Sequence, residues 1–371
     1  MTDGTDHEFM ARALELAGRA AASSDPNPAV GCVIVRDGRV VGEGFTQRAG
    51  GNHAEIEALE AAGEAAAGAT VYVSLEPCAH TGRTGPCAEA LIKAAVARVV
   101  YALEDPNPAV AGKGAAMLAA AGIATEAPVL AAAAREINRG YCARIERGRP
   151  WVRCKMAASL DGRTALANGA SQWITGTSAR RDVHRWRARA SAILTGVGTV
   201  IADDPALSAR PDDDFDIDVL QPVRVIVDSG LRTPPGARTL GLDGQVVIFT
   251  GNRAREASGD RAAALEQAGA QIETVTADPR CRLDEVLARL TVLEVNDVWL
   301  ESGPTLAGAM LAAGLIDELV LYFAPSLLGT ESRGMFSLPN MTRLDEQIRL
   351  EIDDLRKVGE DLRIVARTVP G

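Results

Sequence analysis

The sequence contains no apolar run that approaches the roughly 20 residues of a transmembrane helix, and residues 1–9 are polar and acidic, unlike a secretory leader. Cysteine is scarce, with 6 in 371 residues, which excludes a disulfide scaffold and makes a reducing cytoplasm the expected compartment. Excess positive charge is also lacking, since 39 basic residues face 49 acidic ones for a net charge of −10. These absences argue against a membrane protein and against a broad nucleic-acid-binding surface.

Lysine is nearly absent, so arginine carries almost all of the positive charge; the lysines are Lys93, Lys113, Lys155 and Lys357. Arginine binds phosphate and carboxylate groups through paired hydrogen bonds, which lysine cannot form. A few arginines could therefore build a phosphate site despite the acidic balance. A compositional bias of the genome would give the same arginine content.

The length of 371 residues corresponds to two or three domains of ordinary size. The hydrophobic fraction of 47% and the charged fraction of 24% are those of a globular chain. Helical periodicity alternates with short β-branched segments in both halves, which predicts two α/β domains. Gly148, Arg149 and Pro150 form the candidate linker, so we expect domains at residues 1–148 and 149–371.

One hexapeptide occurs twice, because residues 25–30 and residues 105–110 both have the sequence Asp-Pro-Asn-Pro-Ala-Val. Both copies interrupt the helix and strand pattern, so we expect paired loops at one rim of the first domain. In the same domain the pattern of residues 129–147 predicts one closing helix, and in the second domain residues 255–269 are predicted as one helix.

Three side chains of the first half have the types and surroundings of zinc ligands. His53 opens a predicted helix, Cys78 follows a strand, and Cys87 comes nine positions later after a proline. One imidazole and two thiolates leave tetrahedral zinc an open position for water, which is typical of catalytic sites. Glu55 is placed to accept a proton from that water and pass it to a leaving amine, as in hydrolytic deaminases. A closed zinc site, or cysteines buried without a metal, is the alternative.

Residues 77–87 depart from nucleoside deaminases, which usually have two residues between the cysteines. This segment resembles the deaminase half of the bifunctional riboflavin-biosynthesis deaminase/reductase family, which implies a cytidine-deaminase-like three-layer α/β/α domain. The resemblance implies substrate contacts by Asn27, His80, Arg83, Asp105 and Asn107. His80 could instead be structural, and Asp105 and Asn107 could simply form a turn.

In the second half, Gly196 and Gly198 follow a strand but lack the third glycine of the dinucleotide-binding fingerprint. Residues 303–308 form a glycine-rich turn between a strand and a helix, where backbone N–H groups can hold a phosphate. A tight turn without a ligand would use the same glycines.

Four segments of the second half, residues 155–164, 171–175, 203–207 and 301–303, resemble the reductase half of the same family. This resemblance implies a dihydrofolate-reductase-like α/β fold that uses NADPH. The implied cofactor contacts are Ala157, Trp173, Thr199, Asp203, Ser229, Gly303, Pro304, Thr305, Leu306, Ala307, Gly308 and Ala309. The implied substrate contacts are Ser171, Arg187, Leu207, Arg210 and Glu301. Arg187 and Arg210 suit a phosphate, Glu301 suits ribose hydroxyls, and Asp203 is our candidate for proton transfer.

The sequence therefore predicts a bifunctional enzyme with zinc and NADPH as cofactors. It would remove the 2-amino group of 2,5-diamino-6-ribosylamino-4(3H)-pyrimidinone 5′-phosphate and then reduce the ribosyl group to ribityl. A nucleoside or tRNA deaminase fused to an unrelated or inactive nucleotide-binding domain is the alternative. The expected partner is a small phosphorylated substrate, with no nucleic acid and no membrane, and we expect a homo-oligomer.

Overall fold

The computed structural model describes residues 4–79, 85–108, 110–212 and 219–369. The chain divides into two compact units, Met1–Gly148 and Arg149–Gly371, which are described separately below. Within the described ranges, no helix is both long enough and apolar enough to cross a membrane.

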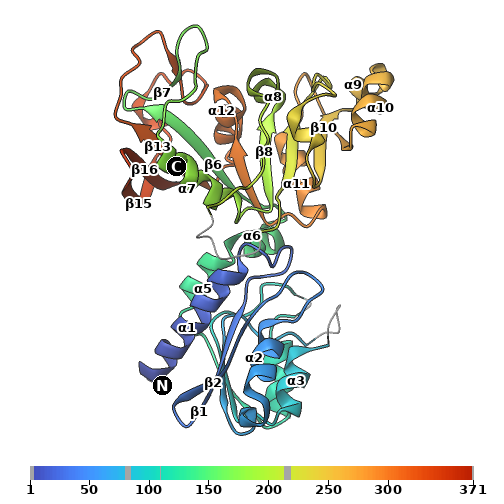
Figure 1. The fold of residues 1–371 in the computed structure, drawn as a ribbon, viewed down its shortest axis with the longest axis vertical. Coiled ribbons are helices and arrows are strands. Elements are labelled where there is room, and N and C mark those ends of the chain that lie inside the picture. The colour runs from blue at the N-terminus through green and yellow to red at the C-terminus, as the bar shows by residue number, and fades with distance from the viewer. Residues whose placement is uncertain (1–3, 80–84, 109, 213–218, 370–371) are drawn as a thin grey trace. The chain divides into compact units, whose positions relative to one another are not determined.

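The first unit is a five-stranded sheet between two layers of helices, with strand order β2-β1-β3-β4-β5. Helices α1 and α5 pack on each other and cover one face, while α2, α3 and α4 cover the other (Figure 1). This is the predicted three-layer α/β/α arrangement. Its elements are α1 Gly4–Ala20, β1 Gly31–Arg36, β2 Arg39–Phe45, α2 Ala54–Ala62, β3 Thr70–Val73, α3 Cys87–Lys93, β4 Arg98–Tyr101, α4 Lys113–Ala120, β5 Ala124–Glu126, α5 Ala131–Ile137 and α6 Arg139–Arg147.

Strand register brings the loops of this unit together at one edge of the sheet. The start of β1 lies opposite the end of β2, since Gly31 pairs with Phe45. The end of β3 lies at the same edge, and β4 runs parallel to β3 and ends beside it. Both Asp-Pro-Asn-Pro loops, which precede β1 and follow β4, therefore lie at the edge where Cys78 follows β3 and α2 follows β2.

Helix α2 lies very close to strand β2, and glycine makes this approach possible. A Cβ atom on Gly44 would lie 2.4 Å from the carbonyl oxygen of Ala54, at the first residue of α2. Because glycine has no side chain, the start of α2 can pack directly against β2, which brings the preceding residue, His53, close to the sheet.

The predicted closing helix over residues 129–147 is wrong as one element, because it is broken at Asn138 into α5 and α6. The Asn138 side chain is buried and forms hydrogen bonds with the backbone of Ala29, 109 residues away. Because this partner lies far away in the sequence, the apolar periodicity of residues 129–147 could not predict the break.

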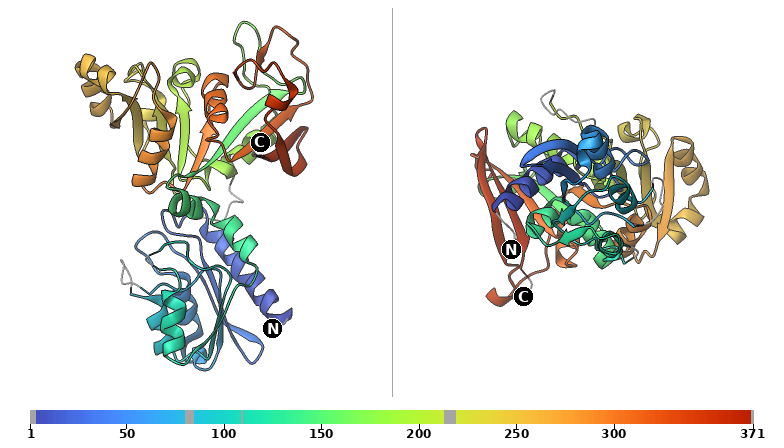
Figure 2. Two further views of the ribbon diagram at one scale, coloured as in Figure 1. Left: turned by 180° about the vertical axis from the view of Figure 1, so that it is seen from behind. Right: turned by 90° about the horizontal axis from the view of Figure 1, so that it is seen from below.

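The second unit is a nine-stranded sheet with order β11-β10-β9-β8-β12-β6-β13-β16-β15, seen from behind in Figure 2. Neighbouring strands are parallel except at β16, which runs antiparallel to both of its neighbours, β13 and β15. Helices α11 and α12 contribute to the hydrophobic core on one face, and α7 packs on the other. The core strands and helices are β6 Trp151–Ser159, α7 Thr177–Arg187, β8 Ala192–Gly196, α8 Val197–Asp203, β9 Val223–Val227, β10 Val246–Gly251, α9 Asn252–Ala257, α10 Gly259–Gln267, β11 Ala270–Val275, α11 Leu283–Val292, β12 Asp297–Glu301, α12 Pro304–Ala312, β13 Glu318–Ala324, β15 Leu350–Val358 and β16 Asp361–Thr368.

Smaller elements of this unit differ from the sequence prediction. The helix predicted over residues 255–269 is interrupted at Ser258 and forms α9 and α10. Strands β7 (Arg163–Ala165) and β14 (Arg333–Gly334) pair with each other and were not predicted. Strand β8 passes at Gly196 directly into the short helix α8.

Candidate zinc and reductase sites

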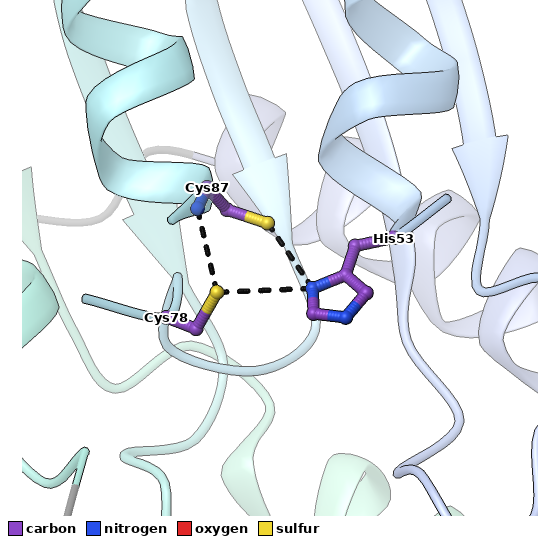
Figure 3. Close-up of side chains that lie close together, drawn as sticks. All are labelled: His53, Cys78 and Cys87. Carbon is purple, nitrogen blue, oxygen red and sulfur yellow. Dashed lines mark hydrogen bonds between the residues drawn. The ribbon is translucent and has the colours of Figure 1, made fainter. Parts of the chain in front are cut away.

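His53, Cys78 and Cys87 converge in the first unit (Figure 3). His53 precedes α2, Cys87 is the first residue of α3, and Cys78 lies in the loop after β3. His53 Nδ1 lies 3.3 Å from Cys87 Sγ and 3.7 Å from Cys78 Sγ. Within the described parts of the chain, these three form the one group of His, Cys, Asp and Glu side chains with the spacing of a metal site.

The distances between these side chains fit tetrahedral zinc. Zinc bonds of about 2.3 Å to sulfur and about 2.0 Å to nitrogen place tetrahedral ligand atoms roughly 3.5 Å apart. The Cys87 backbone N–H donates to Cys78 Sγ at 3.3 Å, which holds the two cysteines in place. The Cys87 thiol, the His53 ring and this N–H lower the pKa of the Cys78 thiol, while the same contact and burial raise the pKa of the Cys87 thiol. Before zinc binds, Cys78 is therefore the sulfur of the pair that is favoured as a thiolate.

Glu55 lies in the first turn of α2 and its side chain is buried, with 4% of the residue exposed. Burial raises the pKa of the Glu55 carboxyl to about 7, and the Cys78 sulfur adds to this increase. A carboxyl group with a pKa near neutrality can both accept and donate a proton. It follows His53 by two residues, and the charges of Cys78 and His53 both act on its carboxyl group.

Three of the five predicted substrate residues of this unit lie in the described part of the chain. Asn27 is half-buried in the first Asp-Pro-Asn-Pro loop, and Asn107 is half-buried in the second. Asp105 is buried and accepts a hydrogen bond from the backbone N–H of Asn107 at 2.8 Å, so it does form the turn that the sequence left open. His80 and Arg83 lie outside the described residues.

Glu76 was missed by the sequence analysis although it directly precedes Pro77 and Cys78. It is buried, and its carboxylate accepts hydrogen bonds from the backbone N–H groups of Gly112 at 3.0 Å and Ala115 at 3.1 Å. A third, longer bond of 3.4 Å comes from the N–H of Asp105. Glu76 therefore connects the loop of Cys78 to the loop after β4.

Most predicted cofactor residues of the second unit lie near the carboxyl ends of its parallel strands. Ala157 is on β6, Thr199 on α8 after β8, and Ser229 after β9, while residues 303–309 begin α12 after β12. Gly303 is exposed, and a Cβ atom on it would meet nothing within 4 Å. Open parallel sheets bind nucleotides at this edge, so these residues fit NADPH. Trp173 is 71% exposed with Arg180 over its ring, and Asp203 is exposed at the end of α8.

Four of the five predicted reductase substrate residues are brought together. Arg187 forms a two-pronged ion pair with Glu301, at 2.6 and 2.7 Å, and donates to the carbonyl of Ser208 at 3.1 Å. Arg210 donates to the hydroxyl of Ser208 at 2.6 Å, and Leu207 is buried beside this segment. No described hydrogen bond connects Ser171 to this cluster.

Two further ionisable groups belong to this cluster and were not predicted. Lys155 pairs in register with Glu301 on the adjacent strand; burial lowers the pKa of its amino group, while the Glu301 charge opposes this. His184 Nδ1 accepts the backbone N–H of Arg210 at 3.1 Å. Burial and the charges of Arg187 and Arg210 lower the pKa of His184 to about 4, so its ring is neutral at pH 7.

Comparison with known proteins agrees with these two sites. Residues 3–103 match the cytidine and deoxycytidylate deaminase zinc-binding region, and residues 150–364 match the RibD C-terminal domain. The riboflavin biosynthesis protein RibD of Escherichia coli (strain K12) is 45% identical over 371 residues, covering 96% of this chain and 98% of the relative. The RibD of Mycobacterium tuberculosis (strain ATCC 25618 / H37Rv) is 43% identical, covering 97% of each chain.

Solved structures give the same result. Acinetobacter baumannii RibD, form 1, is 44% identical with a TM-score of 0.90 and covers 99% of each chain. A diaminohydroxyphosphoribosylaminopyrimidine deaminase/5-amino-6-(5-phosphoribosylamino)uracil reductase from Thermotoga maritima is 29% identical, with a TM-score of 0.85, covering 98% of this chain and 99% of that one. A deaminase fused to an unrelated second domain is not supported, because the second half matches the RibD C-terminal domain. The chain therefore belongs to the RibD family of bifunctional riboflavin-biosynthesis enzymes, which join a zinc-dependent deaminase to an NADPH-dependent reductase.

Proposed function

We propose that residues 1–148 remove the 2-amino group of 2,5-diamino-6-ribosylamino-4(3H)-pyrimidinone 5′-phosphate and that residues 149–371 then reduce its ribosyl group to ribityl. The observation that carries the proposal is the buried Glu55 beside the cluster of His53, Cys78 and Cys87. The names of the Thermotoga maritima relative's two activities support the same pair of reactions.

In the deaminase, His53, Cys78 and Cys87 would hold zinc, which lowers the pKa of a coordinated water to about 7. Glu55 accepts a proton as the water oxygen bonds to C2 of the pyrimidine. It then donates that proton to the departing 2-amino group, so that ammonia leaves and C2 becomes a carbonyl carbon. Asn27 would hydrogen-bond the pyrimidine edge, since an amide both donates and accepts. His80, Arg83, Asp105 and Asn107 would bind the rest of the substrate, with Arg83 at the phosphate.

Replacing Glu55 with glutamine tests this assignment. Because Glu55→Gln removes the group that moves the proton, we expect deamination to fall about 10²- to 10⁴-fold. Zinc content should not change, because Glu55 is not a ligand. NADPH oxidation with the deaminated intermediate, followed at 340 nm, should also stay at the wild-type rate.

Glu57→Gln is the matched control for this experiment. Glu57 lies on the same helix and accepts a hydrogen bond from Asn52 at 2.9 Å, and we assign it no role in the reaction. Near-normal deamination by Glu55→Gln would refute the proton-transfer assignment. Loss of bound zinc in the same variant would show that the substitution disturbs the fold of the first unit.

In the reductase, residues 303–309 would hold a phosphate of NADPH at the start of α12, while Ala157, Trp173, Thr199, Asp203 and Ser229 complete the cofactor site. NADPH supplies a hydride to the ribose-derived carbon, and a proton must reach the substrate as well; Asp203 remains our candidate donor. Arg210 and Arg187 would attract the substrate phosphate, and Glu301 would face the ribose hydroxyls. Ser171 and Leu207 would line the same site.

We also propose that the enzyme is a cytoplasmic homo-oligomer that binds neither nucleic acid nor membranes. All six cysteines lie within the described residues and none is in a disulfide, which suits a reducing compartment. The edge strand β15 exposes apolar side chains that a second copy could cover, and the whole-molecule prediction below tests this contact.

A further inference from the structure

The segment of residues 138–144, which joins α5 to α6 and forms most of α6, contacts both Asp-Pro-Asn-Pro loops of the deaminase. These loops lie 80 positions apart in the sequence, at residues 25–30 and 105–110. Asn138 and Arg144 reach the first loop, and Tyr141 reaches the second. One short segment thus connects the two loops that flank the zinc ligands at the same edge of the sheet.

At the first loop, the side-chain amide of Asn138 forms the two backbone hydrogen bonds that a neighbouring strand would otherwise form. Its Oδ1 accepts the N–H of Ala29 at 2.8 Å, and its Nδ2 donates to the carbonyl of Ala29 at 2.9 Å. Arg144 donates to the carbonyl of Pro26 at 3.2 Å. The two contacts lie on either side of Asn27, so the backbone that carries this side chain is held from both directions.

At the second loop, the contact is between two buried side chains. The Tyr141 hydroxyl donates to Asp105 Oδ1 at 3.1 Å, and the same oxygen accepts the backbone N–H of Asn107 at 2.8 Å. Tyr141 is 8% exposed and Asp105 is 6% exposed. Glu76 holds the far end of this loop through Gly112 and is followed directly by the loop of Cys78. The backbone N–H of Asp105 also donates to Glu76 at 3.4 Å, so hydrogen bonds lead from the Tyr141 hydroxyl through Asp105 to the residue two positions before Cys78.

We propose that Asn138 and Tyr141 are positioning residues of the deaminase, which hold Asn27 and Asn107 at a fixed place relative to the zinc centre. The inference rests on the proposed function, because it requires that the two loops bind substrate. Neither residue touches the reacting atoms. Their loss should weaken substrate binding and leave the chemical step nearly unchanged.

Tyr141→Phe tests the proposal, since it removes one hydroxyl and keeps the ring. A hydrogen bond to a charged, buried carboxylate is worth about tenfold or more in an equilibrium constant. We expect KM for the diaminopyrimidine substrate to rise about tenfold, with kcat within about twofold of wild type. Zinc content should not change, which shows that the first unit is folded, and NADPH oxidation with the deaminated intermediate should stay at the wild-type rate because it belongs to the second unit.

Tyr72→Phe is the matched control. Tyr72 is 4% exposed and its hydroxyl donates to the buried carboxylate of Asp6 at 2.8 Å, on the helix α1 side of the same unit. It should lower the melting temperature while KM stays at the wild-type value. An equal rise of KM in both variants would show general loosening of the unit and overturn the proposal.

Asn107→Ala separates this proposal from the proposed function of the loops. If Asn107→Ala raises KM but Tyr141→Phe does not, the loop binds substrate and Tyr141 does not position it. If neither variant changes KM, both the positioning role and substrate binding by the second loop are wrong. A rise of KM in Tyr141→Phe with normal KM in Tyr72→Phe supports the proposal.

Discussion

Arg187 and Glu301 form an ion pair at the candidate reductase site. Both side chains are largely buried, with 13% and 16% of their surface exposed. Burial alone would raise the pKa of Glu301, but Arg187, Lys155 and the Trp299 N–H lower it to about 2. Since this folded pKa is below the value of an unfolded glutamate, the stabilisation is complete above about pH 4.5 and is lost only as the pH falls toward 2. The pair is therefore fully ionised at any working pH.

Replacing Glu301 with glutamine should strongly destabilise the second unit. Glu301→Gln leaves Arg187 and Lys155 as two neighbouring cations without a carboxylate, and breaking a buried pair costs about 3 kcal/mol or more. Denaturant unfolding followed by tryptophan fluorescence measures this unit alone, because Trp151, Trp173, Trp186 and Trp299 all lie in it.

Glu273→Gln is the control for that measurement. It breaks the Arg289–Glu273 pair, whose arginine is 49% exposed, so it should cost less than about 1 kcal/mol. Adding Lys155→Met to Glu301→Gln removes one of the unpaired cations and should recover part of the lost stability. A loss equal to that of Glu273→Gln would contradict the importance we assign to the buried pair.

How well the sequence predicts the role of a single residue depends on how far away, in sequence, the residues that contact it lie. The sequence pointed to His53, Cys78 and Cys87 as candidate zinc ligands because residue type, proline and spacing occur together in short segments, and the structure brings the three side chains together. Arg187 and Glu301 were each proposed as substrate contacts, but their pairing joins positions 114 residues apart. Tyr141 and Lys155 were missed for the same reason, since each owes its place to a contact across the fold.

At the scale of elements, the two glycines at the start of α12 have different structural roles. The sequence grouped Gly303 and Gly308 as one phosphate-binding turn. A Cβ atom on Gly308 would lie 2.3 Å from the carbonyl oxygen of Ser337, whereas one on Gly303 would meet nothing within 4 Å. Gly308 thus allows the segment around Ser337 to pack on α12, and Gly303 is the glycine that leaves the helix start open to a ligand.

Alanine substitutions should separate these two roles. Gly308→Ala forces a backbone displacement and should cost the second unit about 1–3 kcal/mol. Gly303→Ala should leave stability within about 0.5 kcal/mol but weaken NADPH binding, because its Cβ occupies space next to the helix N-terminus. Tryptophan-monitored unfolding and calorimetric titration with NADPH measure the two effects. Equal stability losses in both variants would contradict the packing role of Gly308.

Helical and strand periodicity in the sequence does not predict where every element begins and ends. The alternation of helical and β-branched segments predicted two α/β domains, and each unit does contain one large sheet with helices packed on it. The breaks at Asn138 and Ser258 and the pairing of β7 with β14 were not predicted. At Asn138 the cause is the backbone of Ala29, and for β7 it is a partner strand about 170 residues away, which no local pattern contains.

At the scale of the whole molecule, the two units carry separate chemistry on one chain, and we expect a second copy to bind at the edge of the nine-stranded sheet. Strand β15 is the edge of the nine-stranded sheet, so one side of its backbone has no neighbouring strand within the described chain. Leu350, Ile352 and Leu355 are 42%, 59% and 61% exposed. Their register with β16 places them on one face of the hairpin, together with Leu362. Helix α7 holds the opposite face through the Arg363–Asp182 pair.

An exposed apolar face on an edge strand is the kind of surface that a second copy covers, since the same strand can pair with itself across a two-fold axis. The double variant Ile352→Lys, Leu355→Lys places four like charges in such a contact, so we expect the oligomer to dissociate. Light scattering coupled to gel filtration at about 10 μM should show the mass of one chain, 38.9 kDa, for the variant and a multiple of it for the wild type.

Val292→Lys is the control, because Val292 is 69% exposed but lies on α11, away from β15. It should keep the wild-type mass, since one added charge outside the contact leaves the apolar face intact. A wild-type mass of one chain would overturn the homo-oligomer, and an oligomer that survives both lysines would place the contact elsewhere on the molecule. Because Glu55 and the zinc ligands belong to the other unit, deamination by the double variant then measures whether the deaminase depends on assembly at all.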